Sequence, residues 1–439
     1  MSRSLPGERN KGRPRIMSPG IDLLMIWKKI TDPKPSIAKR KTRLFFSRSI
    51  NLLKLLSGYF LSRIFRHPFA WGLPAFISIE PTNLCNLRCP ECLTGQKGLT
   101  RPAGMTDPEL FRKIIDQVAD HAGYLTFYFQ GEPFLHGDFF SMVRYARDKG
   151  IYTVTSTNGH FLDPGNAEKT VASGLDRIII SLDGTDQESY SSYRIGGTFG
   201  KVVEGIRALG EARKKASAKK PKIIIQFLVL RTNEHLIPEI KKLSREIGAD
   251  RLELKSAQFY DYANGNPLMP VNRKHSRYIP TGATTLHQES ASLQDDRETR
   301  SPVHPVTCSP VHPVTRSPGH PFTRSPVHPF TRSPGHPFTC SPVHPVTRSP
   351  VHKYRNKNPL PNHCFRMWSS CVVTWDGWVV PCCYDKDAAY RMGNLSGGTL
   401  KEIWRSGEYR EFREKILRSR KDIDICTNCA EGIGITSVL

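Results

Sequence analysis

The chain has 439 residues, a length that ordinary domain sizes divide into roughly two to four folded units. Apolar residues make up 38% and charged residues 24%, close to globular averages, so neither a fibrous protein nor a small disulfide-stapled one is expected. The net charge of +24 is uneven, because residues 1–66 hold 16 basic and three acidic side chains and residues 300–352 hold five Arg and no acid. The rest is only mildly basic, which argues against a specific nucleic-acid groove in the folded part.

The cysteine content and the short apolar runs indicate a reducing compartment. No apolar run reaches the roughly 18 residues that span a bilayer, since Lys54 and Arg63 interrupt the best candidate, and no signal-peptide pattern opens the sequence. We therefore expect a cytoplasmic protein. Eleven Cys in such a chain are more often metal ligands or catalytic thiols than disulfides, because cytosolic thiols are kept reduced.

Residues 1–72 are predicted to form a basic tail followed by an amphipathic helix. Residues 1–49 lack sustained periodicity and are rich in Arg, Lys, Pro and Ser, which is typical of disorder. Over residues 50–65 the apolar side chains recur at helical spacing. They are Ile50, Leu53, Leu56, Phe60 and Ile64. The favoured interpretation is a helix that caps the next domain, and a peripheral membrane contact through residues 50–65 is the alternative.

Residues 73–270 alternate strand-like runs with helical stretches. The strands are expected at 75–80, 124–130, 151–156, 177–183, 222–230 and 251–257, and helices at 108–120, 139–149, 201–215 and 236–247. Six successive strand–helix units predict an α/β fold with a parallel sheet, because each crossover must return over a sheet face. Ligand chemistry is then expected at the carboxyl ends of the strands.

Residues 271–352 are predicted to be an insertion, and residues 300–352 repeat an octapeptide of the type RSPVHPVT. Two Pro per repeat favour polyproline II or disorder. Seven His fall in the repeat: His304, His312, His320, His328, His336, His344 and His352. An eight-residue period rotates successive His off any common face of a three-residue helix, so a neutral repeat expansion is favoured over a metal-binding tract.

Three cysteines, Cys85, Cys89 and Cys92, form C-x3-C-x2-C directly after the first predicted strand. Three thiolates on one loop can hold three irons of a [4Fe–4S] cluster and leave the fourth iron open to coordinate a substrate. Zinc is the alternative, but it needs a nearby fourth Cys or His, and none lies between Leu93 and Asp120.

With this triplet after a first strand, the sequence resembles the radical S-adenosylmethionine enzymes over roughly residues 75–257. The resemblance implies a partial (β/α)6 TIM-like barrel, a [4Fe–4S] cluster with an open iron, and S-adenosylmethionine as cofactor. The segment Gln130-Gly131-Glu132-Pro133 is similar to the GGEP segment of the family, with Gln130 in place of one Gly. In the family, the backbone of this segment and its Glu hold the methionine amino group.

Two further strand ends carry the resemblance. Ser156 and Asn158 lie where the third strand ends, and Ser181 and Asp183 where the fourth ends. The resemblance makes these residues and Arg194 candidate contacts for the ribose or the carboxylate of the cofactor. The alternative for each is an ordinary turn or helix-cap residue.

Residues 353–439 supply a second set of cysteines that resembles the SPASM pattern. The four cysteines expected to bind are Cys364, Cys382, Cys426 and Cys429. Because no Cys follows Cys429, the set resembles the shorter twitch variant, which implies a small α+β domain with one auxiliary [4Fe–4S] cluster. A closed cluster cannot bind substrate through iron and is suited to relaying electrons, while a structural zinc site is the alternative. Cys371 and Cys383 lie off the pattern and are predicted to be buried free thiols.

The resemblance implies an enzyme that cleaves S-adenosylmethionine reductively and removes a hydrogen atom from a substrate, in peptide modification or dehydrogenation. A peptide substrate and an electron donor such as flavodoxin or ferredoxin are the implied partners. The competing hypothesis is a non-catalytic iron–sulfur or zinc protein, redox-sensing and tethered by its basic N-terminal segment. An oxidation also needs a proton acceptor at the barrel mouth, for which Asp261 is the first candidate and Asp385 the second.

Overall fold

The computed structural model describes residues 38–281, 353–357 and 360–429. The predicted disorder of residues 1–37 and the octapeptide repeat both lie outside these residues. Within the described part, no helix combines the length and the apolar character that crossing a membrane requires.

Six parallel strands form the centre of the fold, as predicted. They are β1 (Phe76–Ile79), β2 (Tyr124–Thr126), β3 (Tyr152–Thr157), β4 (Arg177–Ser181), β5 (Lys222–Val229) and β6 (Arg251–Ser256). Each strand pairs in parallel with the next one along the chain. This order is that of a partial (β/α)6 barrel, and it places the loops after β1 to β4 at one end of the sheet.

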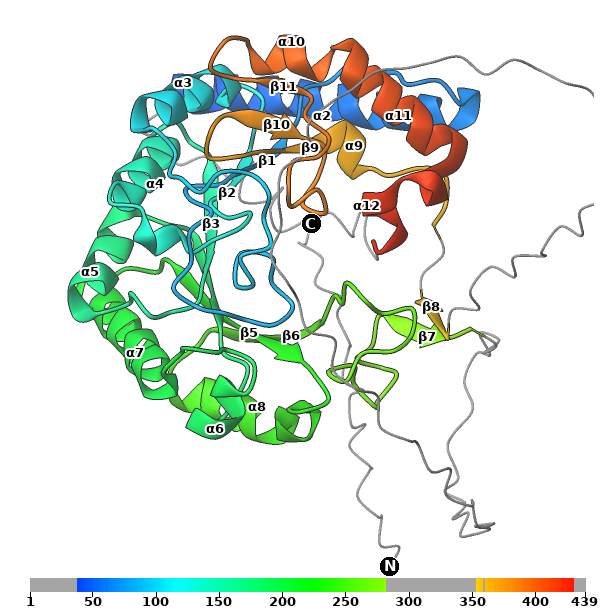
Figure 1. The fold of residues 1–439 in the computed structure, drawn as a ribbon. Helices are drawn as coiled ribbons and strands as arrows, with labels where there is room; N and C mark the ends of the chain where they lie inside the picture. The colour runs from blue at the N-terminus through cyan, green and yellow to red at the C-terminus, as the bar shows by residue number, and fades with distance from the viewer. Residues whose placement is uncertain (1–37, 282–352, 358–359, 430–439) are drawn as a thin grey trace, which may run out of the picture. The chain divides into compact units, whose positions relative to one another are not determined.

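Helices cover the outer side of these strands (Figure 1). The longer ones are α3 (Pro108–Val118), α4 (Phe139–Asp148), α5 (Pro164–Ser173), α7 (Phe199–Lys215) and α8 (Ile237–Glu246), and α6 (Gln187–Ser191) is a short one. Helix α3 shows why these segments form helices that cover the strands. Asp107 caps its first turn, and its buried residues recur at helical spacing: Phe111, Ile114, Ile115 and Val118. These faces pack against the strands in one apolar core.

The strands of the C-terminal region extend the barrel sheet. Strand β9 (Ser370–Val373) pairs in parallel with β1, and β10 (Trp378–Val380) and β11 (Gly393–Asn394) extend it in antiparallel fashion. The nine strands follow the order β11-β10-β9-β1-β2-β3-β4-β5-β6. This pairing satisfies backbone groups at the β1 edge, which an open barrel would otherwise leave unpaired.

Four helices and a strand pair complete the described C-terminal part. The helices are α9 (Arg366–Ser369), α10 (Leu400–Trp404), α11 (Gly407–Ser419) and α12 (Asp424–Thr427), and α11 is the longest of them. Strands β7 (Tyr278–Pro280) and β8 (Tyr354–Asn356) pair in antiparallel fashion, and Thr281 N donates to Lys353 O at 2.9 Å. The two ends of the insertion therefore leave the fold side by side.

Helix α2 (Ala38–Phe65) differs from its prediction in two ways. It begins at Ala38 rather than Ile50, so residues 38–49 are not part of a disordered tail. It packs on the amino-terminal end of the barrel, as a cap should, through a mixed face: Leu55 and Tyr59 are buried, and Arg48 donates to Gly150 O at 2.7 Å and to Ala119 O at 2.8 Å. The predicted apolar face points the other way, and only Leu56 of its five residues packs against the core.

Candidate functional site

The loop after β1 carries Cys85, Cys89 and Cys92, called the cysteine triplet below. Cys89 is buried and the other two are half-buried. All three pack against one apolar cluster formed by Leu87, Tyr193, Leu230, Ala257, Phe259, Met269 and Tyr278. Soft thiol ligands in a dry, apolar surrounding suit an iron–sulfur cluster, whose potential and stability depend on solvent exclusion.

Burial keeps the thiols of Cys85 and Cys89 protonated while no metal is bound. It raises the pKa of Cys85 to about 11 and also raises the pKa of Cys89, although the Arg194 charge works against the second shift. Iron must then displace protons on binding. Within the described part of the chain, no three Cys, His, Asp or Glu side chains converge to hold a single metal ion. A [4Fe–4S] cluster does not need that convergence, because each thiolate binds a different iron.

Glu132 links the end of β2 to the end of β3 and, through Asn158, to the triplet. Its buried carboxylate accepts hydrogen bonds from Thr157 Oγ1 at 2.7 Å, Asn158 N at 2.7 Å and Phe134 N at 3.1 Å. Asn158 Nδ2 lies 3.8 Å from Cys85 Sγ. Burial raises the pKa of Glu132 to about 7 despite the three donors. Glu132 therefore holds two strand ends together besides being the expected ligand of an amino group.

Asp183 and Arg194 form a second link to the triplet. Arg194 Nε donates to Asp183 Oδ2 at 2.5 Å, and its Nη1 lies 3.7 Å from Cys89 Sγ. Asp183 is fully buried and also accepts from Leu228 N at 2.6 Å. The predicted cofactor contacts Asp183 and Arg194 thus engage each other and a triplet cysteine.

The remaining predicted residues of the site lie at the same end of the barrel. Gly131 has φ +74°, and a Cβ there would approach Thr82 O to 2.3 Å, so the turn after β2 requires glycine. Pro133 is buried at the start of a short 3₁₀ turn. Ser156 is half-buried near the end of β3, and Ser181 is buried at the end of β4.

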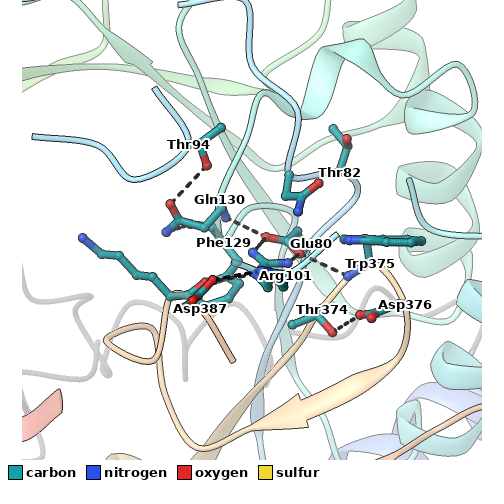
Figure 2. A network of polar contacts seen from close by, with 12 residues as sticks. Glu80, Thr82, Thr94, Arg101, Phe129, Gln130, Thr374, Trp375, Asp376 and Asp387 are labelled. Carbon is teal, nitrogen blue, oxygen red and sulfur yellow. Dashed lines mark hydrogen bonds and ion pairs between the residues drawn. The ribbon is translucent and has the colours of Figure 1, made fainter. Parts of the chain in front are cut away.

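A buried ion pair beside this end of the barrel was not predicted. Glu80, directly after β1, accepts two hydrogen bonds from Arg101, each of 2.6 Å. Figure 2 shows that the same carboxylate accepts from the backbone of Gln130 and of Trp375, both at 3.2 Å. Arg101 Nε also donates to Lys386 O at 3.1 Å. The pair therefore joins the triplet loop, the turn after β2 and the C-terminal region.

A cavity of about 370 Å³ opens inside the barrel, between the β1–β6 strands and the C-terminal region. Polar side chains from the strands line it, together with Tyr128 and Tyr193. Its charged lining is mainly basic: Arg177, Lys255, Arg277, Arg366 and Lys386, against Glu91 and Glu253. A cavity of this size behind the triplet is a suitable place for part of a substrate.

The two predicted proton acceptors do not line this cavity. Asp261 is exposed on the loop after β6, and Asp385 is buried but accepts from the backbone of Ala389 and Tyr390. The cavity instead offers Lys386, whose Nζ donates to Tyr260 Oη at 2.6 Å. Burial lowers the pKa of Lys386, and the charges of Lys255 and Arg277 act in the same direction. No local sequence pattern indicates this pair, because the partners are far apart along the chain.

Four cysteines of the C-terminal region, Cys364, Cys382, Cys426 and Cys429, are called the cysteine quartet below. Three of them, Cys364, Cys426 and Cys429, act electrostatically on Arg420, and Cys426 and Cys429 also act on Cys382. Arg420 Nη2 donates to Cys429 Sγ at 3.2 Å, and although burial opposes it, nearby thiols raise the pKa of Arg420. Burial also raises the pKa of Cys382 and brings that of Cys426 to about 11. The sequence did not indicate Arg420.

The two cysteines outside the quartet differ from each other. Cys371 is buried on β9, and burial raises its pKa to about 12, in agreement with the prediction of a buried free thiol. Cys383 was also expected to be buried, but it is half-buried and lines the barrel cavity, where Arg366 Nη1 lies 3.9 Å from its sulfur.

The strand order and the thiol-bearing loops define a partial α/β barrel of the iron–sulfur class. Residues 79–219 match the profile of the "Radical SAM superfamily", and residues 364–430 match that of SPASM, an "iron-sulfur cluster-binding domain". Residues 79–219 are therefore a radical SAM domain, and residues 364–430 are a SPASM domain. Domains of these families hold a [4Fe–4S] cluster with S-adenosylmethionine and auxiliary iron–sulfur clusters, respectively.

Two curated relatives indicate the range of the family. The AdoMet-dependent heme synthase of Nitratidesulfovibrio vulgaris is 32% identical over 174 residues, covering 39% of this chain and 45% of the relative. The PqqA peptide cyclase of Gluconobacter oxydans is 32% identical over 205 residues, covering 45% and 54%. The chain thus spans about half the length of the curated relatives it matches.

Among solved structures, the chain is similar to Streptococcus suis SuiB bound to S-adenosylmethionine. The sequences are 13% identical, the alignment covers 82% of this chain and 73% of that one, and the TM-score is 0.49. The assignment of a partial (β/α)6 barrel rests on the strand order of this chain itself.

Proposed function

We propose that the protein is a radical S-adenosylmethionine enzyme that removes a hydrogen atom from a substrate in the barrel cavity. The observation that carries this proposal is the convergence of four loops on the cysteine triplet. The loops after β2 and β3 reach Cys85 through Glu132 and Asn158, and the loop after β4 reaches Cys89 through Asp183 and Arg194. A site that only stored a cluster would not need buried polar links from three further strand ends.

In this proposal the protein groups have separate tasks. When bound, the cluster and S-adenosylmethionine supply the 5′-deoxyadenosyl radical that abstracts hydrogen. The triplet would hold the cluster, and Gln130, Gly131 and Glu132 would hold the methionine end of the cofactor. Ser156, Asn158, Ser181, Asp183 and Arg194 remain the candidate contacts for its ribose and carboxylate. The apolar cluster around the triplet excludes water from the radical.

We infer that the substrate is a peptide or another molecule with a carboxylate. The PqqA peptide cyclase relative, by its name, acts on a peptide. Five basic and two acidic residues line the barrel cavity, which favours an anionic group on the part of the substrate that enters. Lys386 in its uncharged form, with its Nζ against Tyr260 Oη, would accept the proton that an oxidation releases, in place of Asp261 or Asp385.

The cysteine quartet would hold an auxiliary [4Fe–4S] cluster that relays electrons, with Arg420 offsetting its negative charge. A small one-electron donor such as flavodoxin or ferredoxin would reduce the clusters. Structural zinc is the alternative for the quartet. A reducing compartment such as the cytoplasm suits the free cysteines of the described chain. A membrane surface is a further proposed partner, contacted by helix α2.

Anaerobic incubation of the reconstituted protein with dithionite and S-adenosylmethionine tests the proposal. The expected product is 5′-deoxyadenosine, formed even without the true substrate. Iron-loaded protein that forms none would favour the competing hypothesis, a non-catalytic iron–sulfur sensor. Iron and zinc analysis of the same sample decides what the quartet holds.

A further inference from the structure

Helix α2 presents an exposed apolar stripe, formed by Phe46, Ile50, Leu53, Phe60 and Ile64. These residues follow one another at spacings of four, three, seven and four, so they lie on one face of the helix. Their exposed fractions are 58%, 51%, 64%, 45% and 70%. The helix has 28 residues and is therefore about 42 Å long. A solvent-exposed apolar surface of this extent normally marks an interaction site.

The charge of α2 is entirely positive. Residues 38–65 contain seven Lys and Arg and no Asp or Glu. Arg43, Lys54 and Arg63 are exposed, and Arg66 directly after the helix is exposed as well. A basic helix with an apolar face is the pattern of segments that lie in the interface of an anionic membrane.

A second cavity lies at the carboxyl end of the stripe. It has a volume of about 370 Å³, and its lining combines two stripe residues, Phe60 and Ile64, with Arg63, Arg66, Asn362 and His363. Arg63 and Arg66 place two positive charges in this lining, and none of its residues is acidic, so the cavity suits an anion.

We propose that α2 binds the surface of an anionic phospholipid bilayer, with the apolar stripe at the boundary of headgroups and acyl chains and a lipid phosphate in the cavity beside Arg63 and Arg66. The inference rests on the membrane contact proposed above and is independent of the catalytic proposal. Continuity between the stripe and the cavity supports it, because a phospholipid likewise joins an apolar chain to an anionic phosphate.

Other candidate occupants of the stripe match the positive charge of α2 less well. Two copies of α2 would bring like charges together across a symmetric interface. Residues 1–37 carry eight basic and three acidic side chains, and residues 300–352 carry no acid, so both segments are repelled by the helix. Residues 282–299 are acidic but hold only two large apolar residues, Leu286 and Leu293, too few to cover the stripe.

The geometry of the barrel agrees with this orientation. The opposite face of α2 packs on the amino-terminal end of the barrel through Arg48, and Asn51 exchanges two hydrogen bonds of 2.8 Å with Leu73. The triplet and the turns that surround it lie at the carboxyl end. A membrane under α2 therefore leaves the mouth of the barrel accessible.

Vesicle co-flotation of the full chain tests the proposal. Vesicles of phosphatidylcholine alone are compared with vesicles that also contain phosphatidylglycerol, at low and high salt. Wild-type protein is expected to float with the anionic vesicles and to lose binding as salt rises. The double variant Leu53→Glu/Ile64→Glu and the double variant Arg63→Gln/Arg66→Gln should each weaken binding about tenfold or more. Val271→Glu is the matched control, because Val271 is an apolar residue outside α2 that is 67% exposed. This variant should float like wild type.

Each alternative has its own result. Equal binding to both vesicle types would overturn the preference for an anionic surface while leaving the membrane contact, and no binding by wild type would overturn both. Dimerisation without lipid that Leu53→Glu abolishes would show that a second copy covers the stripe, and stronger flotation after removal of residues 1–37 would show that the tail covers it. All variants should keep 5′-deoxyadenosine formation, which also shows that they fold, so failure here leaves the catalytic proposal intact.

Discussion

The cysteine triplet and the cysteine quartet are held by the chain in different ways. One loop of eight residues supplies the triplet, whereas the quartet comes from three segments between positions 364 and 429 that only the folded chain brings together. Each has an arginine against a sulfur, Arg194 at 3.7 Å and Arg420 at 3.2 Å. Three ligands leave a cluster open and four close it, so the comparison separates a site for chemistry from a site for electron transfer or stability.

The largest expected effect comes from removing the triplet. Replacing Cys85, Cys89 and Cys92 together by Ala should remove about four irons per chain and abolish formation of 5′-deoxyadenosine. The quartet should keep its metal in this variant, because the two sites use separate ligands. Iron analysis and product chromatography measure the two effects. Full cleavage activity in the triple variant would contradict the proposed role of the triplet.

The converse variant sharpens the comparison. Cys426→Ala/Cys429→Ala should remove a further set of about four irons and lower product formation, while cleavage of S-adenosylmethionine continues at the triplet. Cys371→Ala is the matched control, since it removes another buried thiol and should leave the iron content unchanged. Complete loss of cleavage in the quartet variant, in a sample that still unfolds cooperatively, would show that the two sites are not separable.

A third variant tests which group at the barrel mouth accepts a proton. Lys386→Met should lower product formation about 10²-fold, the usual scale of a general base, and leave 5′-deoxyadenosine formation in place. Asp261→Asn is the comparison, because Asp261 is exposed away from the cavity and its loss should change little. A large loss with Asp261→Asn and none with Lys386→Met would restore the carboxylate predicted from the sequence.

The ion pair between Glu80 and Arg101 connects the barrel, which carries the triplet, with the C-terminal region, which carries the quartet. Arg101→Met leaves a buried carboxylate without its partner and should lower the free energy of unfolding by about 3–5 kcal/mol, measured by urea denaturation. Asp120→Asn, which breaks the exposed pair with Arg43, should change it by about 1 kcal/mol or less. Equal effects of the two substitutions would show that Glu80 and Arg101 do not connect the regions energetically.

The smallest expected effect belongs to the octapeptide repeat. Deletion of residues 300–352 should leave the iron content and 5′-deoxyadenosine formation unchanged, because the repeat has no apolar pattern with which to join a core. A clear loss of either on deletion would assign the repeat a role in one of the two cysteine sites.

Local patterns allowed much of the fold to be predicted. The six strands follow from β-branched runs bounded by turns, and the triplet from a short spacing of cysteines. Contacts between distant segments could not be predicted, because no local pattern specifies them. They include the contacts of Glu80 with Arg101, of Lys386 with Tyr260, and of Arg420 with the quartet. The pairing of β9 with β1 was missed for the same reason.

Helix α2 shows a further limit of sequence patterns. Its periodicity predicted an amphipathic helix but not which face would be covered. Arg48 and Asn51 make hydrogen bonds to backbone groups at the amino-terminal end of the barrel, and Leu55 and Tyr59 are buried on the same face, so the predicted apolar face stays exposed. Amphipathicity identifies the two faces of a helix, and only tertiary contacts decide which of them meets the core.

The strand pair β7 and β8 has a consequence for how this sequence varies by descent. Because Tyr278–Pro280 and Tyr354–Asn356 are hydrogen-bonded to each other, the chain leaves and re-enters the fold at one point. Unequal copying of a repetitive gene segment adds or removes whole octapeptides. Each such event changes the length of the repeat at residues 300–352 and leaves the sequence of the strand pair β7 and β8 unchanged. We therefore expect the number of repeats to vary between related sequences more freely than the two cysteine sites do.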